Sequence, residues 1–225
     1  MRKVDPVRHG QKRGEILHAA LRCFVRDGFH GASTTDICVE AGISPGHLYH
    51  YFPSKETIVE ALVQDSLARA ASRFEAILAS PDVIEALLTE IENTSIHRPE
   101  AQVLSAEALA EACRNPAFAR IVHEHARAMR TLLVGFLTEA QRRGNVDPGL
   151  DPEATANVLL AIVDGARALP IRNPTVDIKQ STEHLRIMLT RFLRPTAVQT
   201  PPAAEKKRRT CGPLGLLKKR NEPRR

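Results

Sequence analysis

Apolar residues recur along most of this chain at the three- and four-residue spacing of an amphipathic helix. Over residues 8–27 the spacing is followed by Ile16, Leu17, Ala20, Leu21, Phe24 and Val25. Gly28 comes next, at a position where a helix commonly ends. No segment shows a convincing alternation of apolar and polar residues, and no Asn-Gly or Asp-Gly pair joins two apolar runs as a hairpin turn. The pattern predicts an all-α protein.

Serine and proline residues mark the starts of the predicted helices. Ser33 is followed three residues later by Asp36, which is the spacing of a capping box. Ser44 precedes Pro45, whose missing N–H does no harm at the first position of a helix, and Ser54 is expected to cap the next helix. With these boundaries we predict nine helices, at residues 8–27, 34–41, 45–51, 55–79, 81–94, 99–114, 116–143, 151–169 and 177–194.

Charge is distributed unevenly along the chain. The net charge of +6 consists of +3 over residues 1–55, −4 over residues 56–194 and +7 over residues 195–225. A basic end on a mildly acidic body indicates a polyanionic partner at that end. Residues 195–225 are rich in proline, alanine and charge, so we expect them to form a disordered basic tail. Two interpretations of this tail stay open, namely non-specific contact with a polyanion and a solvated end that aids solubility.

Length and composition indicate a soluble protein. A chain of 225 residues that is 43% apolar can form one large or two small domains with a real core. Its first residues are charged with no apolar stretch behind them, and the longest apolar run, residues 158–163, is too short to span a bilayer. We therefore expect a cytoplasmic protein without a signal peptide. The cysteines are far apart, lack CxxC spacing and are expected to be buried or free thiols; they are Cys23, Cys38, Cys113 and Cys211.

The segment AGISPGHLYHYFPSKE, residues 41–56, holds both tyrosines of a chain that has seven phenylalanines and no tryptophan. It joins the predicted helices 34–41 and 45–51 through Gly42, a residue type that readily adopts the positive φ of a tight turn. Two short helices joined in this way form a helix-turn-helix. Apolar contacts between the two helices are expected from Ile37, Val39 or Ala41, Ile43, Leu48 and Phe52.

The second helix of this pair is left with a polar face that suits the major groove of DNA. Gly46 lets the backbone approach closely, His47 can bond base edges, and tyrosine hydroxyls reach phosphate oxygens. Tyr49 or His50, together with Tyr51, completes this face. Free N–H groups at the starts of two neighbouring helices also favour a phosphate, beside Lys55 and beside Ser33, Thr34 and Thr35.

Residues 28–62, GFHGASTTDICVEAGISPGHLYHYFPSKETIVEAL, closely resemble the TetR family of bacterial transcriptional regulators. The matching positions are Gly28, Phe29, Ser33, Asp36, Ile37, Ala41, Gly42, Ser44, Gly46, Leu48, Tyr49, Tyr51, Phe52, Lys55 and Glu56. The later stretches EACRNPAF, RRGNVDP and IVDGA look like a common subtype of the family's ligand-binding domain, the AcrR/BetI-like one. Two positions depart from the pattern, because His47 replaces a small hydroxyl residue or alanine and Thr35 stands where a basic residue is frequent. The operator sequence therefore cannot be transferred from a relative.

The resemblance implies a homodimer with an all-helical body, in which the last two helices of each chain form a four-helix interface. It also implies binding to a palindromic operator in double-stranded DNA, and repression that a small molecule releases. The helix at 55–79 is the expected lever between the two activities. By position, the resemblance implies DNA contacts at Thr34, Thr35, Pro45, Gly46, His47, Tyr49, Tyr51 and Lys55. The full set of candidate DNA contacts is Ser33, Thr34, Thr35, Ser44, Pro45, Gly46, His47, Tyr49, His50, Tyr51 and Lys55.

Candidates for an effector site are scattered over the predicted body. Asn157 and Asp164 are seven residues apart and share one face of an apolar helix, where they either line an effector cavity or form hydrogen bonds at the dimer interface. Weaker candidates are Glu107, Glu111, His123, Arg127 and Met129. His123 and His125 are two residues apart and point away from each other on a helix, so no metal site is predicted. No cofactor is expected either.

The sequence thus predicts a DNA-binding domain at residues 1–55, an effector-binding and dimerisation domain at 56–194, and the tail at 195–225. The predicted function is that of a dimeric repressor released from its operator by a small molecule. Two alternatives stay open, namely a regulator controlled by a protein partner and an activator. An enzyme is not expected, because the chain has no GxSxG, phosphate-binding loop, HExxH or convincing pair of carboxylates.

Overall fold

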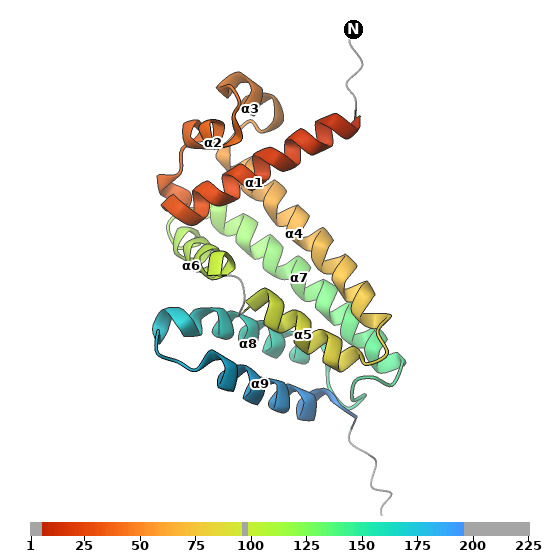
Figure 1. Cartoon of the computed structure of the whole chain (residues 1–225). Coiled ribbons are helices and arrows are strands. Elements are labelled where there is room, and N and C mark those ends of the chain that lie inside the picture. Colours follow the sequence, from red (N-terminus) through yellow and green to blue (C-terminus); the bar gives the residue numbers. More distant parts are fainter. Residues whose placement is uncertain (1–5, 96–98, 196–225) are drawn as a thin grey trace, which may run out of the picture. The chain divides into compact units, whose positions relative to one another are not determined.

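Nine helices and no strand make up the residues that the computed structural model describes, 6–95 and 99–195 (Figure 1). The all-α class and the nine predicted helices are confirmed. The helices are α1 (Pro6–Gly31), α2 (Thr34–Ala41), α3 (Pro45–Tyr51), α4 (Lys55–Leu78), α5 (Val83–Ser95), α6 (Pro99–Ala112), α7 (Pro116–Arg142), α8 (Pro152–Arg172) and α9 (Ile178–Leu193). Apart from Pro195, the predicted tail at residues 195–225 lies outside the described residues, as does Cys211.

The caps that the sequence predicts set the starts of α2, α3 and α4. The Ser33 hydroxyl accepts a hydrogen bond from the Asp36 N–H at 3.1 Å, and the Asp36 carboxylate accepts one from the Ser33 N–H at 2.9 Å, so the capping box is confirmed. Ser44 caps α3 by accepting from the His47 N–H at 3.3 Å. Ser54 caps α4 in the same way. Between α2 and α3, Gly42 is in the left-handed conformation with φ of 61°.

Two helices extend beyond their predicted ends. In α1 the backbone breaks at Gly28, with φ of 70° and ψ of 167°, and one more turn follows to Gly31. The positive φ at Gly28 favours glycine, and a Cβ there would lie 2.8 Å from the Glu107 carboxylate of α6, which would have to move. In α8 the prediction stopped before Pro170, but the helix continues to Arg172 because the Asn173 N–H donates to the Leu169 carbonyl at 2.9 Å.

Two apolar clusters hold the helices together. The head cluster includes Ile16, Phe24, Phe29, Ile37, Leu48 and Phe52 of α1–α3, and it takes in Ile58 and Ala61 of α4 and Phe118 of α7. The body cluster includes Ile77, Leu87, Leu88, Leu133, Phe136, Leu137, Leu159 and Leu189. We call α1–α3 with the first turns of α4 the head, and the remaining helices the body. The long helices α4 and α7 pack against each other (Figure 1). Phe118 of α7 contributes its ring to the head cluster.

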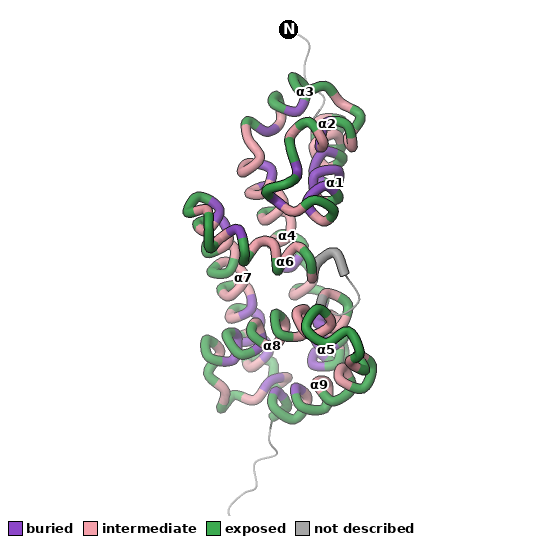
Figure 2. Tube along the Cα trace, turned by 90° about the vertical axis from the view of Figure 1, so that its left-hand side faces the viewer, coloured by how far each residue is buried: buried purple, intermediate pink, exposed green. Residues whose placement is uncertain are grey.

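Exposed apolar residues occur on both α8 and α9. Figure 2 marks the exposed stretches of these helices in green. On α9 the exposed residues His184, Ile187, Met188, Arg191 and Phe192 follow helix spacing, so they form one stripe. On α8 the exposed apolar residues are Val158 and Ile171. Among the described helices α8 has the length and composition of a membrane-spanning helix, a combination that core helices of other proteins also show.

Candidate nucleic-acid interface

The polar face predicted for α3 is exposed. Leu48 is the buried residue of this helix, and its burial leaves the polar face of α3 exposed to solvent. Exposed candidate contacts are Ser33, Thr35, Ser44, Pro45, Gly46, His47, Tyr49 and His50, whereas Thr34, Tyr51 and Lys55 are half-buried. Val39 is 78% exposed, so of the two alternatives for the packing of α2, Ala41 is the residue against the head cluster.

The start of α2 and the middle of α3 meet through two hydroxyl groups. Thr34 Oγ1 and Tyr49 Oη lie 3.4 Å apart, and the exposed fraction of Tyr49 is 51%. Two neighbouring hydroxyls on adjacent helices can donate together to a phosphate oxygen. Gly46 has open space where a Cβ would stand, so the backbone of α3 can approach a partner closely there.

His9 of α1 joins the candidate residues of α3, although it is not among the contacts that the sequence predicts. Its ring stacks on Tyr51 with centroids 4.5 Å apart, and the rings of His47 and His50 lie 5.4 Å from the Tyr51 ring. Tyr51 also packs against the head cluster, so its ring is less available to DNA than that of Tyr49. No sequence signal connects residue 9 with residue 51, because their contact depends on how α1 crosses α3.

Lys55 is held by the head itself. Its ammonium donates to the Phe29 carbonyl at 2.6 Å and to the Ala32 carbonyl at 3.0 Å, and it lies 4.4 Å from the centre of the Phe29 ring. These carbonyls belong to the last turn of α1 and the residue after it. Since an ammonium has three N–H donors, the predicted phosphate contact is left with one of them. A DNA contact by Lys55 stays a prediction.

Lys55→Met is expected to lower the free energy of unfolding by about 1–3 kcal/mol, because it leaves two carbonyls without their charged donor. Urea denaturation followed by circular dichroism measures this loss. Lys179→Met, at an exposed position of α9, is the matched control and should cost little. Unchanged stability together with weaker binding to every DNA sequence would show instead that Lys55 acts mainly on phosphate.

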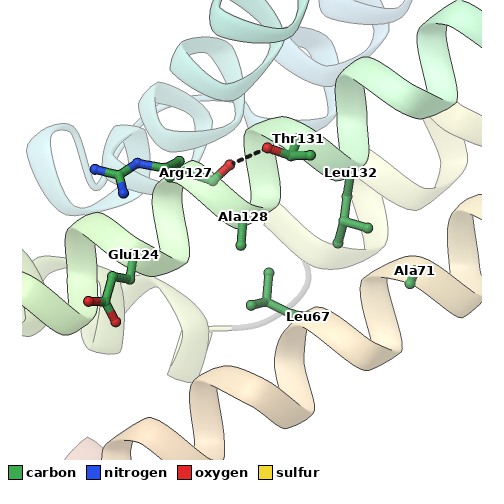
Figure 3. Close-up of a pocket in the computed structure, with 7 residues that line it drawn as sticks. All are labelled: Leu67, Ala71, Glu124, Arg127, Ala128, Thr131 and Leu132. Atoms are coloured by element: carbon green, nitrogen blue, oxygen red, sulfur yellow. Dashed lines mark hydrogen bonds between the residues drawn. The ribbon is translucent and has the colours of Figure 1, made fainter.

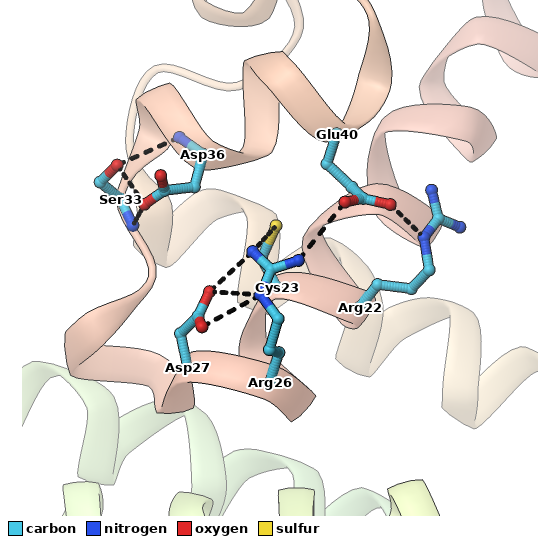
Figure 4. A network of polar contacts seen from close by, with 7 residues as sticks. All are labelled: Arg22, Cys23, Arg26, Asp27, Ser33, Asp36 and Glu40. Atoms are coloured by element: carbon cyan, nitrogen blue, oxygen red, sulfur yellow. Dashed lines mark hydrogen bonds and ion pairs between the residues drawn. The ribbon is translucent and has the colours of Figure 1, made fainter.

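An ion-pair network fixes α2 on α1 (Figure 4). Arg22 donates to the Glu40 carboxylate at 2.6 Å, and Arg26 lies 2.8 Å from Asp27 and 3.5 Å from Glu40. The hydrogen bond from Arg22 lowers the pKa of Glu40, and the bonds from Ser33 lower the pKa of Asp36. Burial raises the pKa of the Cys23 thiol beside this network, which keeps it protonated and unreactive.

The network predicts that acid destabilises the head. Because the pKa values of Glu40 and Asp36 are lower in the folded state, their stabilisation is present above the ordinary carboxyl range and is lost as pH falls toward the lowered values. The melting temperature of Glu40→Gln should therefore lie below that of the wild type at pH 7, and the gap should narrow below about pH 4. Thermal unfolding from pH 7 to pH 3 checks this. A gap independent of pH would contradict the assigned role of Glu40.

The candidate effector residues do not surround one cavity. Glu107 lies against Gly28, and the buried Glu111 accepts a hydrogen bond from Asn115 at 3.3 Å. Asn157, Asp164 and His123 are exposed, and Met129 is half-buried. Arg127 alone among the candidates lines an open groove of about 490 Å³ between α4 and α7, whose other lining residues are Leu67, Ala71, Glu124, Ala128, Thr131 and Leu132 (Figure 3). The candidates belong to α6, α7 and α8, and these helices do not bring their side chains together at one site.

Comparisons with known proteins agree with this arrangement. Residues 16–62 match the family described as "Bacterial regulatory proteins, tetR family", and residues 81–194 match "BetI-type transcriptional repressor, C-terminal". The transcriptional regulator UidR of Escherichia coli K12 is 30% identical over 156 residues, which cover 69% of this chain and 80% of UidR. The transcriptional repressor KstR2 of Mycolicibacterium smegmatis is 30% identical over 149 residues, 65% of this chain and 73% of the relative.

Solved structures show the same fold. Salmonella enterica GusR superposes with a TM-score of 0.68 at 30% identity, covering 86% of this chain and 99% of GusR. Bacillus subtilis FadR, solved in complex with stearoyl-CoA, superposes with a TM-score of 0.62 at 20% identity, covering 78% of this chain and 96% of FadR.

Proposed function

Because this chain belongs to the TetR family of bacterial transcriptional regulators, we propose that it is a dimeric repressor that binds a two-fold symmetric operator and is released by a small-molecule effector. The family consists of transcriptional regulators and not of enzymes. The observation that carries the proposal is the exposed polar face of α3, with His47 and Tyr49 on a helix whose opposite side is anchored by Leu48. A rigidly held helix with base-reading side chains suits the major groove.

His47 is proposed to read the operator sequence, whereas Thr34 and Tyr49 position the head on phosphates. His47 lies in the first turn of α3, next to Gly46, where the backbone is open. A histidine ring nitrogen can bond a base edge, but a hydroxyl bonded to phosphate carries no sequence information.

His47→Ala should therefore change which operator bases are preferred. We expect it to reduce discrimination at the contacted base pair by about 1–3 kcal/mol and to leave the protein's stability nearly unchanged, since His47 is exposed. Competition binding with operators changed at single positions measures this discrimination. His18→Ala, an exposed histidine of α1, is the control and should keep the wild-type preference. If His47→Ala weakened all sequences equally, the base contact would be assigned to the wrong residue.

The exposed faces of α8 and α9 are proposed to form the dimer interface. Ile187, Met188 and Phe192 provide an apolar stripe on α9, and Val158 is an exposed apolar residue of α8. Such faces associate through burial of apolar surface, and a two-fold axis pairs each residue with its own copy or a neighbour. Asn157 and Asp164, exposed on the same helix as Val158, would then form hydrogen bonds across the interface.

A small-molecule effector is supported by the match of residues 81–194 to a repressor C-terminal domain and by the ligand bound to FadR, which has the same fold. An effector can act only by binding more tightly to one of two states of the dimer. We propose that the states differ in the separation of the two heads, because two half-sites of a symmetric operator fit one spacing only.

Repression is tested with a bacterial reporter gene whose promoter overlaps a DNA site that the purified protein binds. Expression of the protein should lower reporter activity, and His47→Ala should restore it. A rise in reporter activity would identify an activator. Unchanged activity, with the site occupied, would contradict regulation at this site.

A further inference from the structure

In the middle of α7 a polar side chain, His125, lies between the two apolar clusters. Phe118 belongs to the head cluster and Leu133 to the body cluster. His125 lies seven residues after Phe118 and therefore on the same face of α7. Its Nε2 atom is buried and has no hydrogen-bond partner among the described residues. A buried polar atom without a partner is costly, so its presence here calls for a physical reason.

Arg167 of α8 presents a second such atom. Its side chain is 26% exposed, and its one ion pair, to Asp164 at 3.3 Å, uses a terminal nitrogen. The Nε atom is buried and has no hydrogen-bond partner among the described residues. Asp164 itself is 69% exposed in one protomer, so its carboxylate is also open to water or to a partner subunit. The guanidinium is thus covered by protein while part of its donor set is unused.

These two side chains act on each other across the α7–α8 contact. Burial lowers the pKa of His125, and the charge of Arg167 lowers it further, while Asp164 acts in the opposite direction. Burial also lowers the pKa of Arg167, against the effect of Asp164. The lowered pKa favours the neutral form of His125, and the charge of Arg167 is balanced by Asp164 at one terminal nitrogen. The unmet need at this place is an acceptor for the Arg167 Nε–H and a partner for His125 Nε2.

Apolar side chains stand beside Arg167 on α8. Val163 and Leu160 precede Arg167 by four and seven residues, so they share its face of the helix. Both are half-buried and pack against the body cluster. A guanidinium next to such a surface matches a molecule with an anionic group at one end and an apolar remainder.

We propose that His125 and Arg167 bind the carboxylate of an apolar organic acid, and that such an acid is the effector. The proposal rests on the proposed function, since it gives the effector a chemical class. Arg167 pairs with the carboxylate through Nε and a terminal nitrogen, the bidentate geometry that guanidinium favours. His125 donates from Nε2 to the same group. The apolar remainder lies along Val163 and Leu160. Neither His125 nor Arg167 is among the effector residues that the sequence predicts.

The test compares carboxylates with their uncharged amides. Octanoate, benzoate, octanamide and benzamide are titrated into the full chain, and dissociation constants are obtained from the rise in melting temperature. We expect both acids to bind at least about 10-fold more tightly than their amides. Acids that bind no better than the amides would overturn the proposal.

Matched variants assign this difference to the two side chains. Arg167→Gln and His125→Gln should each weaken octanoate at least about 10-fold, whereas Arg172→Gln on α8 and His123→Gln on α7, both at exposed positions, should change it less than about 2-fold. If Arg167→Gln fails to fold, Arg167→Lys keeps the charge without an Nε–H and should also weaken octanoate. If Arg167→Gln or Arg167→Lys bound octanoate with wild-type affinity, the proposed carboxylate site would be wrong.

Selection of bound DNA sequences with the same wild-type sample separates this proposal from the proposed function. Specific DNA binding without any preference for acids over amides would remove the carboxylate site and leave the regulator standing. Preference for acids without specific DNA binding would keep the site and overturn the assignment of the acid as a releasing effector.

Discussion

Replacing Met188 with aspartate is expected to turn the proposed dimer into monomers and to weaken operator binding by at least about 100-fold. Met188 is 49% exposed and lies between Ile187 and Phe192 in the apolar stripe of α9. In a two-fold interface each protomer contributes the same residue, so the substitution places two carboxylates in an apolar contact. Unpaired charges are strongly unfavourable there. A monomer binds one half-site and loses the gain from the second.

Sedimentation velocity and operator titration measure both effects on one sample. Thr138→Asp is the matched control, because it adds the same charge at an exposed position of α7. This variant should remain dimeric and bind the operator as the wild type does. A Met188→Asp protein that stays dimeric would show that α9 lies outside the interface.

Phe118→Ala is expected to lower the free energy of unfolding by about 3–5 kcal/mol and to loosen the head specifically. The Phe118 ring is buried and lies 4.5 Å from the ring of Phe29, which in turn contacts Lys55. The Phe118 N–H is capped by Asn115, and Asn115 donates to the buried Glu111 of α6. Removing the ring leaves a cavity where the α6–α7 connection enters the head.

Phe136→Ala is the control for a general loss of stability. Phe136 is equally buried on the same helix but belongs to the body cluster, where it lies 5.1 Å from Phe74. Amide hydrogen exchange should show faster exchange in α1–α3 for Phe118→Ala than for Phe136→Ala at matched total stability. Equal exchange profiles would mean that Phe118 contributes to the fold as a whole and does not join head to body.

These contacts suggest how the binding of an effector in the body would change the position of the head. The sequence predicts α4 as the lever, since this helix continues from the head into the body. The structure adds a second connection through Phe118 and through Glu107, which lies against Gly28. Movement of α6 relative to α7 would therefore act on the last turn of α1 and on the hydrogen bonds that Lys55 donates to Phe29 and Ala32.

Local chemistry explains why the helices could be predicted. A cap such as Ser33 with Asp36, or a turn such as Gly42, acts on residues within four positions, and these signals are readable in the sequence. The two extensions had other causes. The turn after Gly28 is closed by a hydrogen bond from the Ala32 N–H to the Gly28 carbonyl where α1 packs on α6, and the end of α8 spans Pro170 through the hydrogen bond from Asn173 to Leu169.

Partners across helices could not be predicted in the same way. The helical period indicates which face of α3 is polar, and the exposure of His47 and Tyr49 agrees with it. It does not indicate which helix crosses that face, so the stacking of His9 on Tyr51 and the hydrogen bonds of Lys55 had no signal. Likewise, His125 and Arg167 belong to different helices, and only the packing of α7 on α8 brings them together.

Two heads, held together by the body, are proposed to read a symmetric DNA site. Selection of bound sequences from a random double-stranded library with the purified full chain tests this proposal directly. We expect a consensus with two-fold symmetry whose half-sites lie about one helical turn, or a multiple of it, apart. Enrichment of a single unpaired half-site, or of no sequence at all, would contradict it.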